Sequence, residues 1–194
     1  NPNIVAVSKT FTIKDILPLI NYGHLHFGEN KVQESIEKWT EIKKENNQIK
    51  LHMIGKLQTN KVKYVVSLFD YIHSLDNLKL AKKISSELTK QNKKIKIFIQ
   101  VNIGNEPQKS GVMLEDLNFF FNECKQYLNL DIIGLMCLPP VSDNSEKYFE
   151  KMKILSNELN LPELSMGMSK DYLTAALNNA SYVRIGSKIF GKRN

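Results

Sequence analysis

Cysteine is scarce in this chain of 194 residues, which contains only Cys124 and Cys137. Two cysteines are too few for a disulfide framework, and their spacing is unlike that of a metal-binding knuckle. We expect both to be reduced thiols in the core or on a helix face. Long apolar runs are also lacking, since no segment approaches the ~18 residues of a membrane span, and the N-terminus has no signal-peptide pattern. We therefore predict a cytoplasmic protein with no membrane partner.

Arginine is rare although the chain is basic. There are 27 basic and 20 acidic residues, a formal net charge of +7, yet only Arg184 and Arg193 are arginines. The lysines alternate with Asn, Glu and Ser and lack the interleaved aromatic residues of a base-stacking surface. This pattern predicts a solvated helix face and no nucleic-acid partner. The alternative, a nucleic-acid-binding module, rests on the lysine excess alone. An arginine inside an apolar segment, as at Arg184, is therefore conspicuous.

Short apolar runs that end in polar residues or glycine alternate with segments of helical apolar spacing. Strict alternation predicts parallel strand pairing with right-handed crossovers, and eight such units fit a closed barrel better than an open sheet. We expect a single domain over residues 1–194 of the α/β class with the (β/α)₈ TIM-barrel fold. The expected strands are residues 4–8, 24–28, 51–54, 71–74, 95–102, 130–137, 164–168 and 182–185. The expected helices are residues 12–22, 31–45, 60–69, 77–91, 114–128, 145–159 and 170–178.

One helix is missing from this count. A typical barrel of this kind has about 250 residues and eight outer helices, whereas this sequence predicts seven helices and none after the last strand. The first strand also begins almost at the N-terminus. We therefore expect an exposed apolar groove at the seam between the first and last strands, or a truncated N-terminal helix.

Lys9 follows the first predicted strand, and the loops at the carboxyl ends of the strands carry the function of such barrels. A lysine between the barrel and its helices cannot easily keep its ammonium hydrated. Desolvation lowers the pKa of such a group toward the nucleophilic amine that Schiff-base chemistry needs. The alternative is a lysine whose side chain extends from the barrel mouth into solvent.

The end of the last strand has the pattern of a phosphate site. Backbone N–H groups at the Gly186-Ser187 turn form an anion-binding concavity, and Arg184 adds a fixed positive charge. Ser165 to Ser169, at the end of the preceding strand, either add donors to the same phosphate or supply Ser169 as a helix N-cap. Asp76 is expected to cap another helix.

The four histidines, His24, His26, His52 and His73, have no carboxylate partner at ligand spacing. We expect packed or rim histidines and no metal site. The sequence also contains no nucleophile elbow and no pair of acids placed for hydrolysis, so we predict no catalytic residue.

Five blocks of this sequence resemble the signature blocks of the pyridoxal phosphate homeostasis protein family, in order and over nearly the whole chain. The resemblance implies a barrel similar to the N-terminal domain of alanine racemase, the type III fold of pyridoxal 5′-phosphate (PLP) proteins, with PLP held as a Schiff base on Lys9. The blocks are Ala6-Val7-Ser8-Lys9-Thr10, Phe27-Gly28-Glu29-Asn30-Lys31-Val32-Gln33-Glu34, His52-Met53-Ile54-Gly55-Lys56-Leu57-Gln58-Thr59-Asn60-Lys61, Leu164 to Ser169, and Arg184 to Gly191.

The resemblance also implies roles for further residues. Arg184 would face the pyridine nitrogen and keep it unprotonated, which weakens the ring as an electron sink. Asn30 would lie near the cofactor, and Lys109 would be a second amine that takes the aldehyde from Lys9. The phosphate contacts would be Ser165, Gly186 and Ser187.

Members of this family are regarded as carriers or regulators of the vitamin B6 pool, so the resemblance implies a non-catalytic, monomeric PLP protein with PLP-dependent apo-enzymes as partners. The alternative is a PLP-dependent amino-acid racemase. Racemisation by two bases needs a second proton-transferring residue, which alanine racemase obtains from a second domain and a partner subunit. Family chains usually carry an N-terminal helix before the first strand, and here only residues 1–3 precede that strand, so we expect this covering helix to be missing.

Overall fold

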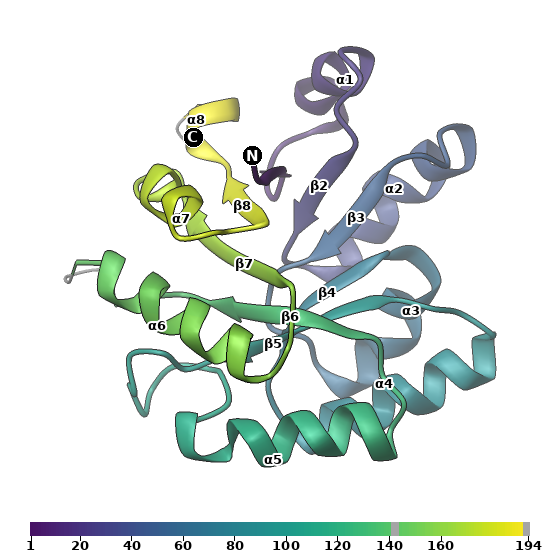
Figure 1. The fold of residues 1–194 in the computed structure, drawn as a ribbon. Coiled ribbons are helices and arrows are strands. Elements are labelled where there is room, and N and C mark those ends of the chain that lie inside the picture. Colours follow the sequence, from purple (N-terminus) through teal and green to yellow (C-terminus); the bar gives the residue numbers. More distant parts are fainter. Residues whose placement is uncertain (141–143, 192–194) are drawn as a thin grey trace.

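The computed structural model describes residues 1–140 and 144–191, in which strands and helices alternate (Figure 1). The strands are β1 (Asn3–Val7), β2 (His26–Glu29), β3 (Lys50–Met53), β4 (Tyr71–Leu75), β5 (Lys96–Val101), β6 (Ile132–Cys137), β7 (Glu163–Met168) and β8 (Tyr182–Ile185). The α-helices are α1 (Ile13–Asn21), α2 (Val32–Glu45), α3 (Val62–Leu68), α4 (Leu78–Gln91), α5 (Leu117–Asn122), α6 (Glu146–Glu158), α7 (Tyr172–Leu177) and α8 (Ser187–Phe190). Short 3₁₀ turns precede α3 and α5 (Thr59–Lys61 and Leu114–Asp116), and a π-helical turn (Glu123–Tyr127) extends α5.

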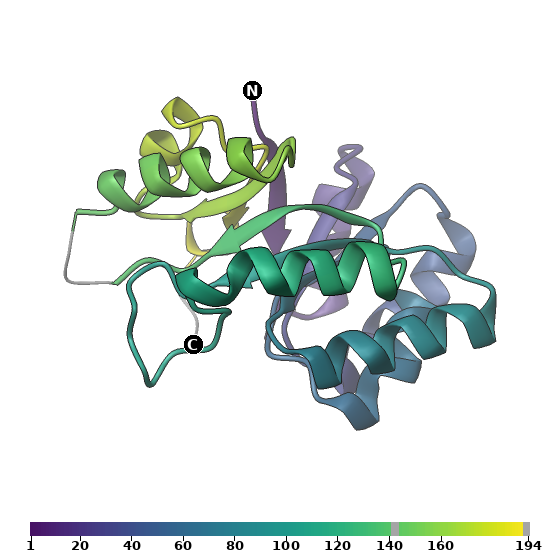
Figure 2. The same cartoon turned by 60° about the horizontal axis from the view of Figure 1, so that its bottom comes forward.

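The eight strands form one closed parallel barrel, and their order around it is their order in the sequence. The barrel closes where β1 pairs with β8 over four residue pairs, from Asn3 opposite Tyr182 to Ala6 opposite Ile185. Helices lie around the strands in both ribbon views (Figure 1, Figure 2). Since all strands run the same way, their carboxyl ends meet at one rim. The predicted fold class is confirmed.

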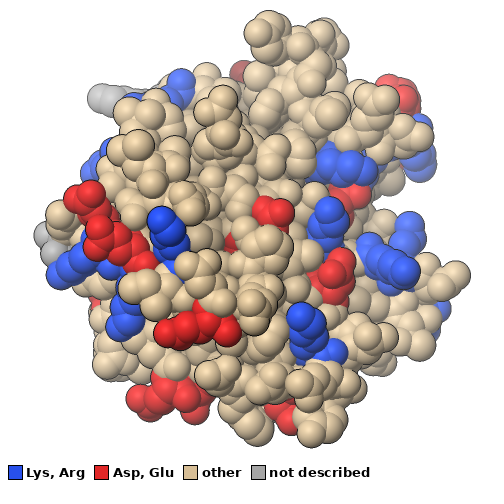
Figure 3. Space-filling model, viewed as in Figure 1, with Lys and Arg blue, Asp and Glu red and all other residues tan. Residues whose placement is uncertain are grey.

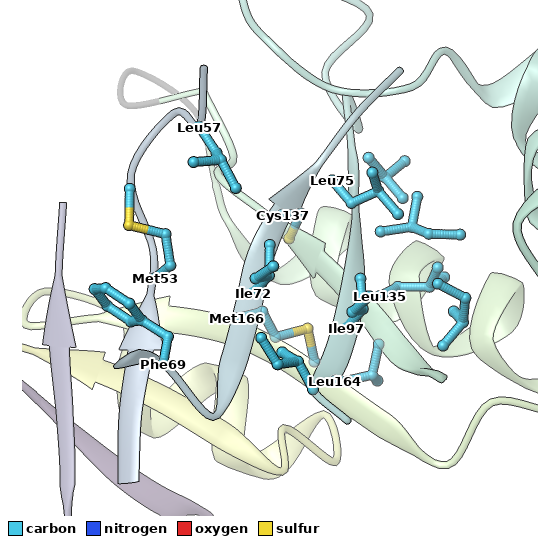
Figure 4. Close-up of a cluster of buried hydrophobic side chains, with 14 of the residues drawn as sticks. Met53, Leu57, Phe69, Ile72, Leu75, Ile97, Leu135, Cys137, Leu164 and Met166 are labelled. Atoms are coloured by element: carbon cyan, nitrogen blue, oxygen red, sulfur yellow. The ribbon is translucent and has the colours of Figure 1, made fainter. Parts of the chain in front are cut away.

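The main hydrophobic core lies between the outer face of the barrel and the helices. Side chains on alternate strand positions point outward and pack against the apolar faces of the helices, where Trp39 of α2 and Phe149 of α6 are fully buried. Figure 4 shows part of this core, in which residues from β3 to β7, such as Met53 and Met166, lie in one cluster. Burial of this apolar surface, at about 25 cal/mol per Å², is the main force that holds the helices on the barrel.

The other strand positions point into the barrel. A second, smaller hydrophobic cluster fills part of this interior and contains Val5, Tyr71, Phe98, Met136 and Tyr182. The interior is therefore a packed core, and a ligand reaches the barrel from its rim.

Three predictions about the ends of elements are wrong. β2 begins at His26, and His24 lies in the preceding loop with its ring nitrogen Nε2 2.9 Å from the His26 carbonyl oxygen. The N-cap of α4 is Asn77 rather than Asp76, because the Asn77 side chain accepts a hydrogen bond from the first turn of the helix. A helix does follow the last strand, since residues 187–190 form α8.

The apolar groove expected beside the seam is present. It has a volume of about 620 Å³ and lies between the N-terminal residues and α7, where Leu173 and Leu177 are 64% and 84% exposed. Ile4 of β1 is 43% exposed on the same seam. The groove flanks the paired strands without separating them, because the β1–β8 ladder continues beneath it.

Basic and acidic side chains are intermixed on the face of the molecule in Figure 3. The lysine excess therefore forms no large patch of a single sign on that face. Within residues 1–140 and 144–191, every helix is too short or too polar to cross a membrane.

Candidate functional site

Lys9 stands directly after β1 at the rim formed by the carboxyl ends of the strands, and it is half-buried. The next residue, Thr10, has a φ of 70°, a left-handed conformation that β-branched residues rarely adopt. Its backbone N–H donates a hydrogen bond of 2.8 Å to Glu34 Oε1 on α2. This contact supports the strained turn, which fixes the direction in which the chain leaves Lys9.

A buried polar cluster anchors the backbone just before Lys9. The Glu29 oxygen Oε1 accepts hydrogen bonds from the Ser8 hydroxyl (2.7 Å), the Trp39 indole (2.9 Å) and the Lys38 ammonium (3.0 Å). The same ammonium donates to the Ser8 carbonyl oxygen at 2.9 Å. Because Ser8 and Glu29 are fully buried, the cluster ties the ends of β1 and β2 firmly to α2.

Arg184 lies inside the barrel on β8 and is only 4% exposed. Its Nη1 donates to the Ser165 hydroxyl and carbonyl oxygens, at 2.6 and 2.7 Å, and its Nη2 donates to the Cys137 carbonyl oxygen at 2.8 Å. Burial lowers the pKa of Arg184, yet a guanidinium remains a donor that cannot accept a hydrogen bond. The structure thus brings two predicted site residues, Ser165 and Arg184, into direct contact.

Ser169 links the ends of β7 and β8, since its hydroxyl accepts a hydrogen bond of 3.4 Å from the Gly186 backbone N–H. The alternative that Ser169 caps the next helix is wrong. The N-cap of α7 is Asp171, whose carboxylate accepts a hydrogen bond of 2.7 Å from the Met168 N–H. Ser187 begins α8 and is exposed at the same rim.

Asn30 follows β2 at the rim, where Gly55 approaches it closely. A Cβ atom on Gly55 would lie 2.4 Å from the Asn30 carbonyl oxygen, so glycine allows the two rim segments to meet. The buried side-chain oxygen of Asn30 has no hydrogen-bond partner among the described residues. An unsatisfied buried polar atom at a rim is available to a bound group.

Lys109 lies in the loop after β5, on the side of the barrel opposite β1. Its ammonium forms an ion pair of 2.6 Å with Glu106 and donates to the Pro139 carbonyl oxygen at 3.5 Å. These contacts place Lys109 at the rim between the loops that follow β5 and β6.

A role for the histidines was not predicted from the sequence. His26, His52 and His73 point into the barrel from β2, β3 and β4, and Nδ1 of His73 lies 2.8 Å from the Ser165 hydroxyl. Their positions on three consecutive predicted strands were visible in the sequence. Without the barrel geometry, however, nothing connected them to a serine on β7.

This end of the barrel therefore carries an amine just after β1, a fixed guanidinium inside the barrel on β8, and backbone and hydroxyl donors at the ends of β7 and β8. Such a donor set suits a ligand with a carbonyl group and an anionic group. The unsatisfied oxygen of Asn30 and the close approach at Gly55 indicate that β2 and β3 contribute to the same mouth.

Comparison with known proteins agrees with this arrangement. The sequence profile of the family "Alanine racemase, N-terminal domain" matches residues 1–194. A pyridoxal phosphate homeostasis protein of Aquifex aeolicus is 39% identical over 199 residues, which cover 98% of this chain and 86% of that protein. The pyridoxal phosphate homeostasis protein of Escherichia coli K12 is 31% identical over 200 residues, with the same coverage of both chains.

Solved structures give the same result. The structure of PipY from Synechococcus elongatus with PLP bound has a TM-score of 0.91 and 32% identity, and covers 98% of this chain and 92% of that chain. Alanine racemase from Corynebacterium glutamicum, at 14% identity and a TM-score of 0.75 over 57% of its chain, shares the fold. The chain therefore belongs to the family of alanine racemase N-terminal domains and, within it, to the pyridoxal phosphate homeostasis proteins.

Proposed function

We propose that this protein binds PLP through Lys9 and takes part in the intracellular homeostasis of this vitamin B6 cofactor. One observation carries the proposal: Lys9 follows β1, while Arg184 lies on β8 and the Gly186-Ser187 turn follows it, and these two strands pair directly at the closure of the barrel. The names of the relatives and the PLP-bound structure of PipY support it.

Lys9 is the covalent anchor in this proposal. Its amine would hold PLP covalently through the aldehyde group of the cofactor. The buried cluster around Glu29 and the turn at Thr10 hold the backbone on both sides of Lys9, so the amine is presented from a fixed position. Fixed presentation reduces the entropy lost on attachment.

Arg184 sets the electronic state of the ring. When bound, PLP supplies a pyridine ring that withdraws electrons most strongly when its nitrogen is protonated. Because the guanidinium of Arg184 can only donate, it would hold a facing pyridine nitrogen unprotonated. This arrangement favours storage of the cofactor over reactions that need a strong electron sink.

We assign the phosphate to the rim formed by Gly186, Ser187 and Ser169. Ser169 joins the residues predicted from the sequence because its hydroxyl already contacts the Gly186 N–H. Ser165, which the sequence predicts as a phosphate contact, is assigned a different role, because its buried hydroxyl contacts Arg184 and His73. In this proposal Ser165 holds the arginine.

The proposal includes a non-catalytic role. A racemase needs a proton-transferring group on each face of the ring, and the likeness to alanine racemases at 14% identity concerns the fold alone. We propose that the protein carries PLP as a monomer in the cytoplasm and delivers it to PLP-dependent apo-enzymes, with Lys109 as a second amine that receives the aldehyde.

Absorbance spectroscopy tests the proposal. The purified protein is mixed with PLP, and the visible band of the Schiff base is recorded before and after reduction with borohydride, which converts the carbon–nitrogen double bond to a stable amine. We expect the band to disappear on reduction, and peptide mass spectrometry to locate the phosphopyridoxyl group on Lys9.

Two variants give the controls. Lys9→Ala should show no band and no adduct, whereas Lys14→Ala, which removes an exposed lysine on α1, should behave as wild type. Absence of the band from the folded wild-type protein, or an adduct that forms equally in Lys9→Ala, would overturn the proposal.

A further inference from the structure

A file of hydrogen-bonded side chains runs through the barrel interior to Arg184. Nδ1 of His26 lies 2.9 Å from Nε2 of His52, and Nδ1 of His52 lies 2.9 Å from Nε2 of His73. Nδ1 of His73 lies 2.8 Å from the Ser165 hydroxyl, which accepts a hydrogen bond of 2.6 Å from Arg184. The members come from β2, β3, β4, β7 and β8, so the file crosses the barrel.

The direction of the hydrogen bonds follows from the arginine. Arg184 can only donate, so the Ser165 oxygen accepts from it and the single Ser165 proton must go to another acceptor. Among the described residues, the other recorded partner of this hydroxyl is Nδ1 of His73. The Ser165 hydroxyl therefore donates to His73, which must carry its own proton on Nε2.

Each further hydrogen bond in the file then has a fixed direction. Nε2–H of His73 donates to Nδ1 of His52, which places the proton of His52 on Nε2, and Nε2–H of His52 donates to Nδ1 of His26. The reverse direction would leave the Ser165 proton buried without an acceptor. His26, at the far end, is half-buried, so solvent can reach it.

The two inner rings are neutral and closely packed. His52 and His73 are fully buried, and burial holds the pKa of each well below its ordinary value, with the charge of Arg184 acting further on His73. A protonated imidazole within the file would donate from both ring nitrogens, so one of its N–H groups would face the hydrogen-bond donor of a neighbour. His52 stacks on Tyr71 at 4.1 Å between ring centroids, and His73 packs on Phe98 at 4.4 Å, so each ring is held against an aromatic neighbour.

We infer that His73, His52 and His26 are positioning residues for Arg184. The three imidazoles are neutral, and each carries its proton on Nε2. Together they orient the Ser165 hydroxyl so that its oxygen faces the guanidinium. A serine hydroxyl on its own can rotate its proton toward the arginine. His73 removes that freedom by accepting the proton, so Ser165 acts as a fixed acceptor. This inference rests on the proposed function, in which Arg184 faces the pyridine nitrogen of PLP.

The first experiment determines which ring nitrogens carry protons, and it needs no ligand. Long-range proton–nitrogen correlation spectra of the whole chain, labelled at histidine, distinguish protonated from unprotonated ring nitrogens. At neutral pH we expect His52 and His73 to be neutral with the proton on Nε2. A proton on Nδ1 of either ring, or a charged ring, would overturn the inference even if PLP binds as proposed.

The second experiment compares two variants of His73. In His73→Asn the side-chain oxygen stands near the former Nδ1 and can still accept the Ser165 proton, whereas His73→Phe keeps a ring against Phe98 with no acceptor. We expect His73→Phe to weaken PLP binding about tenfold, the cost of one misdirected hydrogen bond. It should also shift the visible band, because Arg184 is less well fixed. His73→Asn should retain most of the wild-type affinity and band position.

His24→Asn is the matched control. His24 is a histidine of the same region, and its ring contacts the backbone carbonyl of His26 rather than a side chain of the file. Urea unfolding of each variant separates a binding effect from a folding effect. Equal PLP affinity and equal spectra for folded His73→Phe and wild type would overturn the inference, as would equal losses in His73→Phe and His73→Asn. If the wild-type protein binds no PLP, the proposed function fails, and the proton positions still decide whether the file exists as described.

Discussion

Ser8 and Glu29 form a buried hydrogen bond of 2.7 Å immediately behind Lys9. The bond joins the end of β1 to the end of β2, and the same carboxylate oxygen accepts from Lys38 and Trp39 of α2. The anchoring lysine of the proposed site therefore follows a backbone position that is held by a buried charged pair. Rigidity at the rim is supplied from outside the barrel.

Replacement of Lys38 should be costly for this reason. Lys38→Met leaves the fully buried Glu29 carboxylate without its counter-ion, and we expect a loss of about 3–5 kcal/mol in the free energy of unfolding. The double variant Glu29→Gln with Lys38→Met removes both charges and should be more stable than Lys38→Met alone. Urea unfolding of the wild type, Lys38→Met, Glu29→Gln and the double variant measures this coupling. Equal stability of Lys38→Met and wild type would show that the pair does not hold the cluster.

Gly167 of β7 is predicted to tolerate no side chain. Its φ is +88°, and a Cβ atom there would lie 2.5 Å from the Cβ of Ala175 on α7. Gly167→Ala adds backbone strain to overpacking, so we expect a loss of about 2–4 kcal/mol in unfolding free energy.

Gly23 provides the matched control for this variant. It has a similar φ of +94°, but a Cβ atom there would meet no atom within 4 Å. Gly23→Ala should therefore lose only the strain of the left-handed backbone, about 1 kcal/mol. Equal losses in the two variants, measured by urea unfolding, would show that α7 moves away to admit the new methyl group.

The barrel itself could be predicted from the sequence because each strand is a short apolar run followed by a polar or glycine residue. The ends of elements depend on tertiary contacts and were predicted less well. Ser169 and Asp171 are both suitable N-caps. Only the position of Gly186, just after the next strand, shows that the Ser169 hydroxyl accepts a hydrogen bond from the Gly186 N–H instead.

Some residues of the candidate site could be predicted from the sequence more fully than others. Lys9 and Arg184 are charged residues at or near the ends of apolar strands, so residue type and position alone indicated a candidate site. Ser165 also belongs to a recognisable block, but its hydroxyl points to Arg184 and His73 because of how β4, β7 and β8 face each other inside the barrel. Sequence spacing on single strands carries no information about such cross-barrel contacts.

The two cysteines should be inert in the folded protein. Burial raises the pKa of Cys124 and of Cys137 to about 12 each, and both side chains are fully buried. At pH 8 only about one thiol in 10⁴ would be ionised, and the thiolate is the reactive form. A thiol reagent such as dithionitrobenzoate should therefore label neither cysteine in the native protein and both after unfolding in urea. Rapid labelling of the native protein would show that one of these core regions opens.

The stability of the fold should fall in mild acid. Burial lowers the pKa of His26 below its ordinary value of 6.5, and lowers the pKa values of His52 and His73 much further. Smaller effects on His26 come from His24 and Lys50, which lower its pKa, and from Asp70, which raises it. The unfolded chain therefore binds more protons than the folded chain between pH 6.5 and the lower pKa values of the folded rings.

The sign of the pH effect follows from this difference in proton binding. The stabilisation due to the neutral rings is fully present above about pH 6.5 and is lost as the pH falls toward the folded pKa values, by up to about 1.4 kcal/mol per pH unit for each titrating ring. Unfolding free energies measured in urea between pH 7 and pH 5 should decrease accordingly. His52→Gln should show a shallower decrease, because one buried ring no longer titrates in the unfolded chain. A stability that is constant or increases from pH 7 to pH 5 would contradict neutral histidines inside the barrel.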